Sequence, residues 1–120
     1  MSNKSNFLNT FKYAFEGICF VVKNNRNMRI HILAALGALA LAYYFKITTF
    51  ETGLVIIMIV LVMVTEMINT VVEETVNMIT KDYKIEAKIA KDVSAGAVLV
   101  SSLAALIVGI FIFAPKLVIR

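Results

Sequence analysis

The chain has 120 residues, of which 60% are hydrophobic, and its mean hydropathy is +0.85. Soluble domains are about half apolar, so this composition predicts one membrane domain and argues against a soluble protein. The formal net charge of +4 suits a protein that faces anionic lipid headgroups. The single cysteine, Cys19, excludes a disulfide within the chain, and the single histidine, His31, excludes a metal site built from several histidines. The N-terminal residues do not have the pattern of a signal peptide, so we expect the apolar spans to direct insertion.

Residues 5–24 have the pattern of an amphipathic helix. Apolar residues recur at steps of three and four, and polar residues fall largely on the opposite face. This pattern predicts a surface helix that lies in the membrane interface with its aromatic side chains among the acyl chains. The alternative is a helix packed on a soluble core, which we favour less because the rest of the chain shows no such core.

Three apolar stretches predict three membrane-spanning helices, at residues 30–45, 53–79 and 93–113. Residues 80–92 form the one substantial hydrophilic loop, and we expect the third span to stop at the only proline, Pro115. The whole chain, 1–120, is thus expected to form a single all-α integral membrane domain.

Basic residues are distributed unequally about these spans, with nine on one side and three on the other. Because such residues favour the cytoplasm, the N-terminus and the 80–92 loop are expected there and the C-terminus outside. The nine are Lys4, Lys12, Lys23, Arg26, Arg29, Lys81, Lys84, Lys88 and Lys91, and the three are Lys46, Lys116 and Arg120.

Small residues recur on the first and third spans at spacings that allow close helix packing. Three helices enclose little interior by themselves, so we expect a homo-oligomer. The small residues are Ala34, Ala38 and Ala42 on the first span and Ser102, Ala105 and Gly109 on the third.

A polar stripe runs along the second span and contains Glu66, Asn69, Thr70, Glu73 and Asn77. At 100° per residue, Glu66 and Glu73 differ by only about 20° around the helix axis. The five residues therefore share one face over about three turns.

The two carboxylates of the stripe are expected at different depths. Twelve apolar residues, 53–64, precede them and span about 18 Å. In a hydrocarbon layer about 30 Å thick, Glu66 then lies about 10 Å short of the cytoplasmic edge, and Glu73 lies near water. A charge at the depth of Glu66 costs at least about 2.5 kcal/mol.

Two interpretations of Glu66 compete. It either holds helices together or accepts a proton at the depth of a lipid headgroup, and we favour the second because intramembrane carboxylates are usually functional. Glu73 would then meet a magnesium-bound polyphosphate, since Mg²⁺ prefers one or two carboxylates plus phosphate oxygens. Lys91 could meet phosphate charge, although a lysine-rich loop is usually only solvated.

Two motifs give this chain a family resemblance. Residues 66–73 read E-M-I-N-T-V-V-E, which resembles the E-x-x-N-[ST]-x-x-E signature of the prokaryotic diacylglycerol kinase family. Residues 90–98 read A-K-D-V-S-A-G-A-V, which resembles the family's A-K-D followed by small residues, at a matching interval. Gly17 and residues 27–31 also fit the family pattern. Soluble nucleotide-binding motifs of the G-x-x-x-x-G-K-[ST] and G-x-G-x-x-G types are absent.

The resemblance implies a homotrimer of three-span subunits, each with a surface helix, in a bacterial cell membrane. It implies transfer of the γ-phosphate of ATP to a lipid alcohol at the cytoplasmic face, with Mg²⁺ as cofactor. Glu66 would be the general base, Asn69 would support it, and Glu73 would bind the metal and ATP. Other ATP-contacting positions would be Tyr13, Asp82, Tyr83, Lys84, Lys91 and Asp92, and lipid-contacting positions would be Glu66, Arg29 and Ala95.

The chain departs from the family pattern at two positions. Asn25 stands where the family usually has a glutamate that serves as the other metal ligand. An amide oxygen can still bind magnesium, but it brings no charge. Asn6 stands where a basic residue often meets the nucleotide.

The lipid substrate is a choice between two branches of the family, diacylglycerol kinases and undecaprenol kinases. The sequences at 95–98 and 26–31 look more like the undecaprenol branch, which we favour. Two non-enzymatic alternatives are an oligomeric ion or proton channel lined by Glu66 and Glu73, and a structural subunit whose polar stripe only joins helices.

Overall fold

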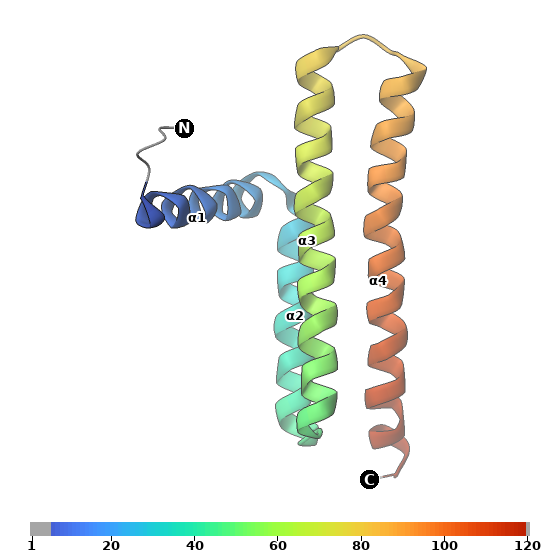
Figure 1. Cartoon of the computed structure of the whole chain (residues 1–120). Helices are drawn as coiled ribbons and strands as arrows, with labels where there is room; N and C mark the ends of the chain where they lie inside the picture. Colours follow the sequence, from blue (N-terminus) through green and yellow to red (C-terminus); the bar gives the residue numbers. More distant parts are fainter. Residues whose placement is uncertain (1–5, 120) are drawn as a thin grey trace.

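The computed structural model describes residues 6–119, and in this range the chain forms four helices (Figure 1). They are α1 (Phe7–Asn24), α2 (Arg26–Phe45), α3 (Thr49–Ile79) and α4 (Ile85–Ile119). Helices α2, α3 and α4 are long and apolar enough to cross a membrane, which confirms the predicted all-α membrane architecture with three spans. Ser5, at the start of the expected surface helix, and Lys4 and Arg120, from the charge comparison, lie outside the described residues.

Helix α1 projects away from the bundle that α2, α3 and α4 form (Figure 1). Its N-cap is Asn6, whose side chain accepts a hydrogen bond from the backbone N–H of Asn9 at 3.0 Å. This contact gives Asn6 a structural role, since an N-cap oxygen satisfies one of the free amide groups of the first turn. The apolar side chains of α1 are largely exposed, including Phe7, Phe11 and Phe15.

The boundary between α1 and α2 is a single extended residue, Asn25. The sequence predicted a surface helix that ends at residue 24 and a span that begins at residue 30, but α2 begins at Arg26. The reason is that the Asn25 side chain caps α2 by accepting from the backbone N–H of Met28 at 3.1 Å. The helix can therefore form in the polar residues before the apolar stretch begins.

Helix α3 begins four residues before the predicted start at Gly53. Thr48 and Glu51 form a capping box, in which each side chain bonds the other's backbone N–H, at 3.1 and 2.9 Å. Such a box satisfies two free amides at the helix start, so the helix extends beyond its apolar part. The predicted end at Ile79 agrees with the structure.

The predicted loop at 80–92 is wrong over most of its length, because α4 already begins at Ile85. Its polar first turns contain an ion pair between Lys88 and Asp92, four residues apart, at 2.6 Å, an arrangement that supports a helix in water. The predicted stop at Pro115 is also wrong, since the helix continues to Ile119. Proline removes one backbone hydrogen bond, but in apolar helices neighbouring groups compensate for it.

The bundle is built mainly on the antiparallel pair of α3 and α4. A hydrogen bond of 2.8 Å joins Thr65 of α3 to Ser101 of α4. Near the start of α3 and the end of α4, Lys116 forms an ion pair with Glu51 at 3.3 Å. Few apolar side chains of the described residues are buried within the single chain, while many large ones are exposed. These exposed surfaces are suited to contact lipid or other subunits.

The start of α2 sits part-way along α3, so α3 and α4 continue beyond it as a hairpin (Figure 1). Helix α2 has 20 residues and is therefore about 30 Å long, close to the thickness of the hydrocarbon layer. The first turn of α2 is level with Glu66, because Asn25 contacts that residue directly. If α2 alone spans the hydrocarbon layer, Glu66 lies nearer the membrane edge than the residue count indicates.

Candidate active site

Glu66 is the most enclosed charged residue of the described chain, with 1% of its surface exposed. It projects from α3 toward the junction of α1 and α2. The Asn25 amide nitrogen donates to Glu66 Oε2 at 2.7 Å, and His31 Nε2 lies 3.3 Å from Oε1. Oε1 is buried and makes no hydrogen bond within the described residues, although His31 lies beside it, so the two carboxylate oxygens have different surroundings.

Asn25 contacts three segments at once. Its backbone N–H donates to the Val21 carbonyl at 2.9 Å, its side-chain oxygen accepts from Met28 N–H, and its side-chain nitrogen donates to Glu66 and to Thr70 Oγ1, the last at 2.9 Å. The amide orientation follows from these partners, because a backbone N–H can only donate and an ionised carboxylate can only accept. Thr70 is also directed, since its hydroxyl donates to the Glu66 backbone carbonyl at 3.1 Å.

Asn69 and Glu73 extend the site toward the exposed end of α3. Asn69 is 6% exposed, and its side-chain nitrogen lies 3.5 Å from Glu73 Oε2, while its buried oxygen has no partner. Glu73 itself is exposed. With Glu66, Thr70, Asn25 and the end of α1, these residues line a cavity of about 220 Å³. The structure therefore brings together four of the five residues of the predicted polar stripe.

The fifth residue of the stripe, Asn77, lies farther along and accepts a hydrogen bond from Lys91 Nζ at 2.8 Å. This bond directs Lys91 of α4 toward the polar face of α3. Asp92, its neighbour, is exposed and pairs with Lys88.

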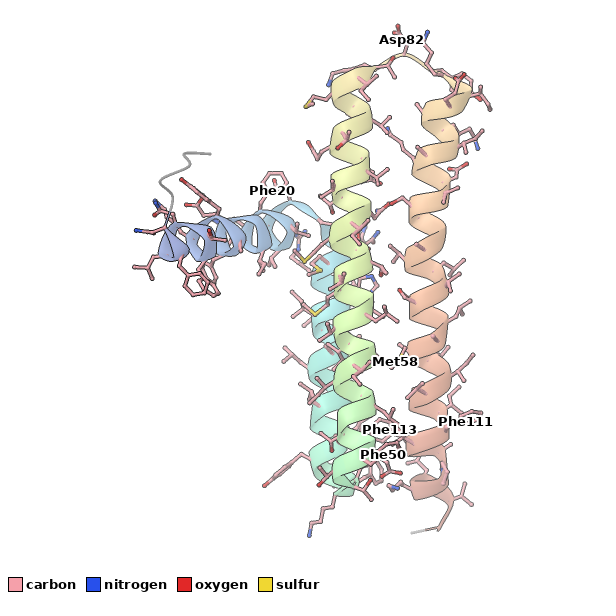
Figure 2. All side chains as sticks on the ribbon, in the orientation of Figure 1. Phe20, Phe50, Met58, Asp82, Phe111 and Phe113 are labelled. Carbon is pink, nitrogen blue, oxygen red and sulfur yellow. The ribbon has the colours of Figure 1, made fainter. Side chains whose placement is uncertain are left out.

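The remaining residues that the resemblance assigned to ATP lie away from Glu66. Asp82, Tyr83 and Lys84 are exposed in the short connection at the tip of the hairpin, where Figure 2 labels Asp82. The 13 residue steps from Glu66 to Ile79 alone cover about 20 Å of helix. Tyr13 is 45% exposed on α1, outside the residues that line the cavity.

Of the two other residues expected to contact lipid, Arg29 has a clear structural partner. Its guanidinium donates to the carbonyls of Val22 and Lys23 at 2.9 and 2.8 Å, and it thereby caps the C-terminal end of α1. A cation at this end of a helix also interacts favourably with the helix dipole. Ala95 is exposed on α4 and does not line the cavity.

Sequence reasoning missed the contact of His31 with Glu66, since it concluded from His31 only that a metal site of several histidines is excluded. The structure places it beside Glu66, with 19% of its side chain exposed. The contact joins α2 to α3 across 35 positions of sequence, so periodicity within one helix carries no signal for it. A lone histidine near the start of one span and a lone carboxylate inside another are the only hints.

A magnesium ion fits one part of this site and not another. Across residues 6–119 no group of three or more histidine, cysteine or acidic side chains is arranged to hold a metal. Exposed Glu73 suits the usual magnesium arrangement, in which one or two carboxylates act with phosphate oxygens of the substrate. Asn25 does not fit, because its oxygen already accepts from Met28 and its nitrogen faces Glu66.

A larger apolar cavity of about 930 Å³ lies between α2, α3 and α4. His31 lines one end of it, which connects this space to the neighbourhood of Glu66. Five of the six small residues predicted to pack on the first and third spans line this cavity, and the sixth, Ala42, is buried outside it. Those that line it include Ala34 and Ala38 on α2 and Ser102, Ala105 and Gly109 on α4.

Together, the fold and the site define a small multi-pass membrane protein with an enclosed carboxylate beside a polar cavity at the end of one span. The sequence pattern of prokaryotic diacylglycerol kinases matches residues 12–113, and the chain belongs to this family. The family resemblance drawn from the two motifs is thereby confirmed.

Two relatives specify the class of enzyme. A diacylglycerol kinase of Synechocystis sp. is 34% identical over 113 residues, which make up 93% of this chain and 65% of the relative. An undecaprenol kinase of Bacillus subtilis is 34% identical over 111 residues, 92% of this chain and 90% of the relative. The chain thus spans just under two thirds of the Synechocystis protein and most of the Bacillus protein. The family and both relatives are lipid kinases, which supports the predicted enzyme class over a channel or a structural subunit.

Proposed function

We propose that this protein transfers the γ-phosphate of ATP to undecaprenol at the cytoplasmic face of a bacterial cell membrane. The observation that carries the proposal is the position of Glu66. It is enclosed, it is level with the start of α2, and it borders a polar cavity that also contains the exposed Glu73. A lipid hydroxyl and a water-soluble phosphate donor can therefore meet at the same cavity.

The reaction uses Glu66 as general base. Its oxygen Oε1 takes the proton of the lipid hydroxyl as the hydroxyl oxygen forms a bond to the γ-phosphorus. The bond between that phosphorus and the oxygen bridging to the β-phosphate breaks, and ADP leaves with the electron pair. Enzymes of this kind act mainly by positioning and electrostatics, and a magnesium ion bound to the phosphates supplies positive charge.

The other residues of the site bind and orient. Asn69 lies between Glu66 and Glu73 on one face of α3, and its amide nitrogen contacts Glu73. Glu73 is the metal and nucleotide ligand, and Lys91, directed toward α3 by Asn77, neutralises phosphate charge. The family motifs imply further contacts with both substrates. The nucleotide would be contacted by Asp82, Tyr83, Lys84, Asp92 and Tyr13. The lipid would be contacted by Arg29 and Ala95.

Undecaprenol is favoured over diacylglycerol as the acceptor. The chain corresponds to 90% of the Bacillus undecaprenol kinase but to 65% of the Synechocystis diacylglycerol kinase, although the identities are equal. The sequence patterns at 26–31 and 95–98 favour the same branch. Diacylglycerol is the alternative acceptor.

The orientation and the assembly are part of the same proposal. Basic residues are in excess in α1 and in the connection between α3 and α4, which favours a cytoplasmic location for this end of the molecule. Exposed aromatic residues along α1 suit a helix that lies in the membrane interface. A homotrimer is supported by the apolar cavity between small-residue faces, because a bundle of three helices with such a gap gains packing from a neighbouring subunit.

The test is transfer of labelled phosphate from ATP in mixed micelles that contain magnesium and either undecaprenol or diacylglycerol. We expect the label in the undecaprenol product. Transfer to diacylglycerol alone would retain the lipid kinase and reject the proposed acceptor. Transfer to neither lipid would reject the proposed reaction.

A further inference from the structure

The residue at the centre of this inference is Asn25, which stands where the family pattern has an acidic metal ligand. Its side-chain oxygen is turned toward the first turn of α2, where it accepts from Met28 N–H at 3.1 Å. Its nitrogen donates to Glu66 Oε2 at 2.7 Å and to Thr70 Oγ1 at 2.9 Å. The side chain thus presents a hydrogen-bond donor to Glu66, and a cation requires the opposite polarity at that position.

Rotation of the Asn25 amide is opposed at both of its ends. A flipped amide would place its NH₂ group against the N–H of Met28 and its oxygen against the Glu66 carboxylate, so that two favourable contacts would become two repulsive ones. The Asn25 backbone is also held, because its N–H ends α1 at the Val21 carbonyl. The donor therefore points at Glu66 from a fixed backbone.

The bond to Glu66 is of a strong kind. It is short, its acceptor is a carboxyl oxygen, and Glu66 is almost fully enclosed, and a hydrogen bond in such an enclosed place is stronger than one in water. The second oxygen of Glu66 faces His31, so the two oxygens have different partners. A donor at Oε2 restrains the carboxylate and leaves Oε1 beside His31.

We propose that Asn25 is a positioning residue, which holds the base Glu66 by donating a hydrogen bond and does not serve as a metal ligand. This inference rests on the proposed function of Glu66 and adds to it. The same residue ends α1 and begins α2, so the geometry of the base depends on the junction of the surface helix with the first span. Metal binding in this chain would then depend on Glu73 and the nucleotide phosphates.

The decisive variant is Asn25→Asp. Aspartate caps helices about as well as asparagine, so the contact with Met28 N–H is kept, whereas the donor to Glu66 is lost and replaced by a second carboxylate. We expect kcat to fall about 10- to 100-fold, with the KM for ATP changed by less than about twofold. Asn9→Asp is the matched control, because it makes the same chemical change at an exposed position of α1, and we expect it to retain wild-type kinetics.

Three results of the kinetic test have distinct meanings. The fall in kcat alone, with an unchanged thermal midpoint in detergent, supports a positioning role. Unchanged turnover would show that Asn25 only caps α2 and would overturn the proposal. Higher turnover, or saturation at a lower magnesium concentration, would show that position 25 binds the metal and would also overturn it.

A second measurement does not depend on kinase activity. Dicyclohexylcarbodiimide modifies protonated carboxyl groups in apolar surroundings, and the modified residue can be identified by peptide mass spectrometry. In Asn25→Asp and Asn25→Ala, Glu66 Oε2 loses the hydrogen bond that holds it in the wild type. We expect Glu66 to be modified faster in Asn25→Asp and Asn25→Ala than in the wild type or Asn9→Asp. Equal rates in all four proteins would overturn the proposed contact. If the wild type transfers no phosphate, the proposed reaction fails and the labelling rates alone decide the role of Asn25.

Discussion

At the scale of single residues, Glu66 and Glu73 lie on one face of α3 but in different surroundings. Glu66 is 1% exposed and bound by Asn25, whereas Glu73 is exposed at the mouth of the same cavity. Two carboxylates with such different surroundings can have different roles in one reaction. An enclosed carboxylate suits proton transfer, and an exposed carboxylate suits the binding of a metal-bound nucleotide.

The Glu66→Gln variant tests the proposed base. Glutamine keeps the size of the side chain but cannot accept a proton at this step, and general bases contribute about 10²- to 10⁴-fold to rate. We expect turnover to fall by at least about 100-fold while ATP affinity, measured by equilibrium binding, stays the same. Turnover equal to that of the wild type would contradict the assignment of Glu66 as base.

The Glu73→Gln variant tests the proposed metal and nucleotide ligand. Removal of its charge should raise the KM for magnesium-ATP by at least about tenfold, which corresponds to about 1.4 kcal/mol. Glu74→Gln removes the same charge from the neighbouring residue and is the control. We expect it to raise the KM for magnesium-ATP less than Glu73→Gln does. Nucleotide titrations over a range of magnesium concentrations measure both effects. An unchanged affinity in Glu73→Gln would argue against its role.

At the scale of the elements, the helix ends position the site. Asn25 both ends α1 and caps α2, and Arg29 returns from α2 to cap the end of α1, so the junction is held from both sides. At the other end of the bundle, the capping box of Thr48 and Glu51 starts α3 directly after the turn from α2. These ends set the register in which α2 and α3 lie side by side, and that register brings Asn25 and His31 to Glu66.

The Thr48→Ala variant tests the contribution of the capping box. Loss of an N-cap side chain costs about 1 kcal/mol, so we expect the thermal midpoint in detergent to fall by a few degrees, with little change in KM for ATP. Thr49→Ala, one residue later and outside the box, is the control and should change the midpoint less. A midpoint that falls equally in both variants would mean that the box has no special role.

At the scale of the whole molecule, the single chain has one narrow polar cavity at Glu66 and one wide apolar cavity within the bundle. Most large apolar side chains of the described helices are exposed, and the small residues of α2 and α4 face the apolar cavity. In a membrane, such a cavity is filled by acyl chains or by another subunit, and close packing of helices favours the second.

The Ala38→Phe variant distinguishes these two occupants. The cavity of about 930 Å³ can hold the added ring, so we expect the fold of one subunit to survive while a neighbouring helix is excluded. If the proposed homotrimer forms through this cavity, its fraction in native mass spectrometry should then fall at least about tenfold. Leu33→Phe, on an exposed part of α2, is the control and should leave the trimer intact. A trimer that survives in Ala38→Phe would mean that subunits do not meet in this cavity.

Much of the architecture follows from the sequence alone. Hydropathy and periodicity are properties of neighbouring residues, and they predicted the three spans, a helix over most of α1 and the shared face of Glu66, Asn69 and Glu73. The two motifs predicted the family. The helix starts and the 80–92 loop were misjudged, because the apolar pattern ends before the helix does where caps and the Lys88–Asp92 ion pair continue it.

The surroundings of Glu66 were decided only by the tertiary structure. Position 25 is 41 residues from Glu66 and His31 is 35 residues away, so both contacts depend on the register between α2 and α3. The sequence also left open whether the Asn25 oxygen binds a metal, and the hydrogen bond to Met28 N–H argues against it. The type and order of the helices are local properties that the sequence alone determines, whereas the partner of each carboxylate oxygen is decided by how separate helices pack.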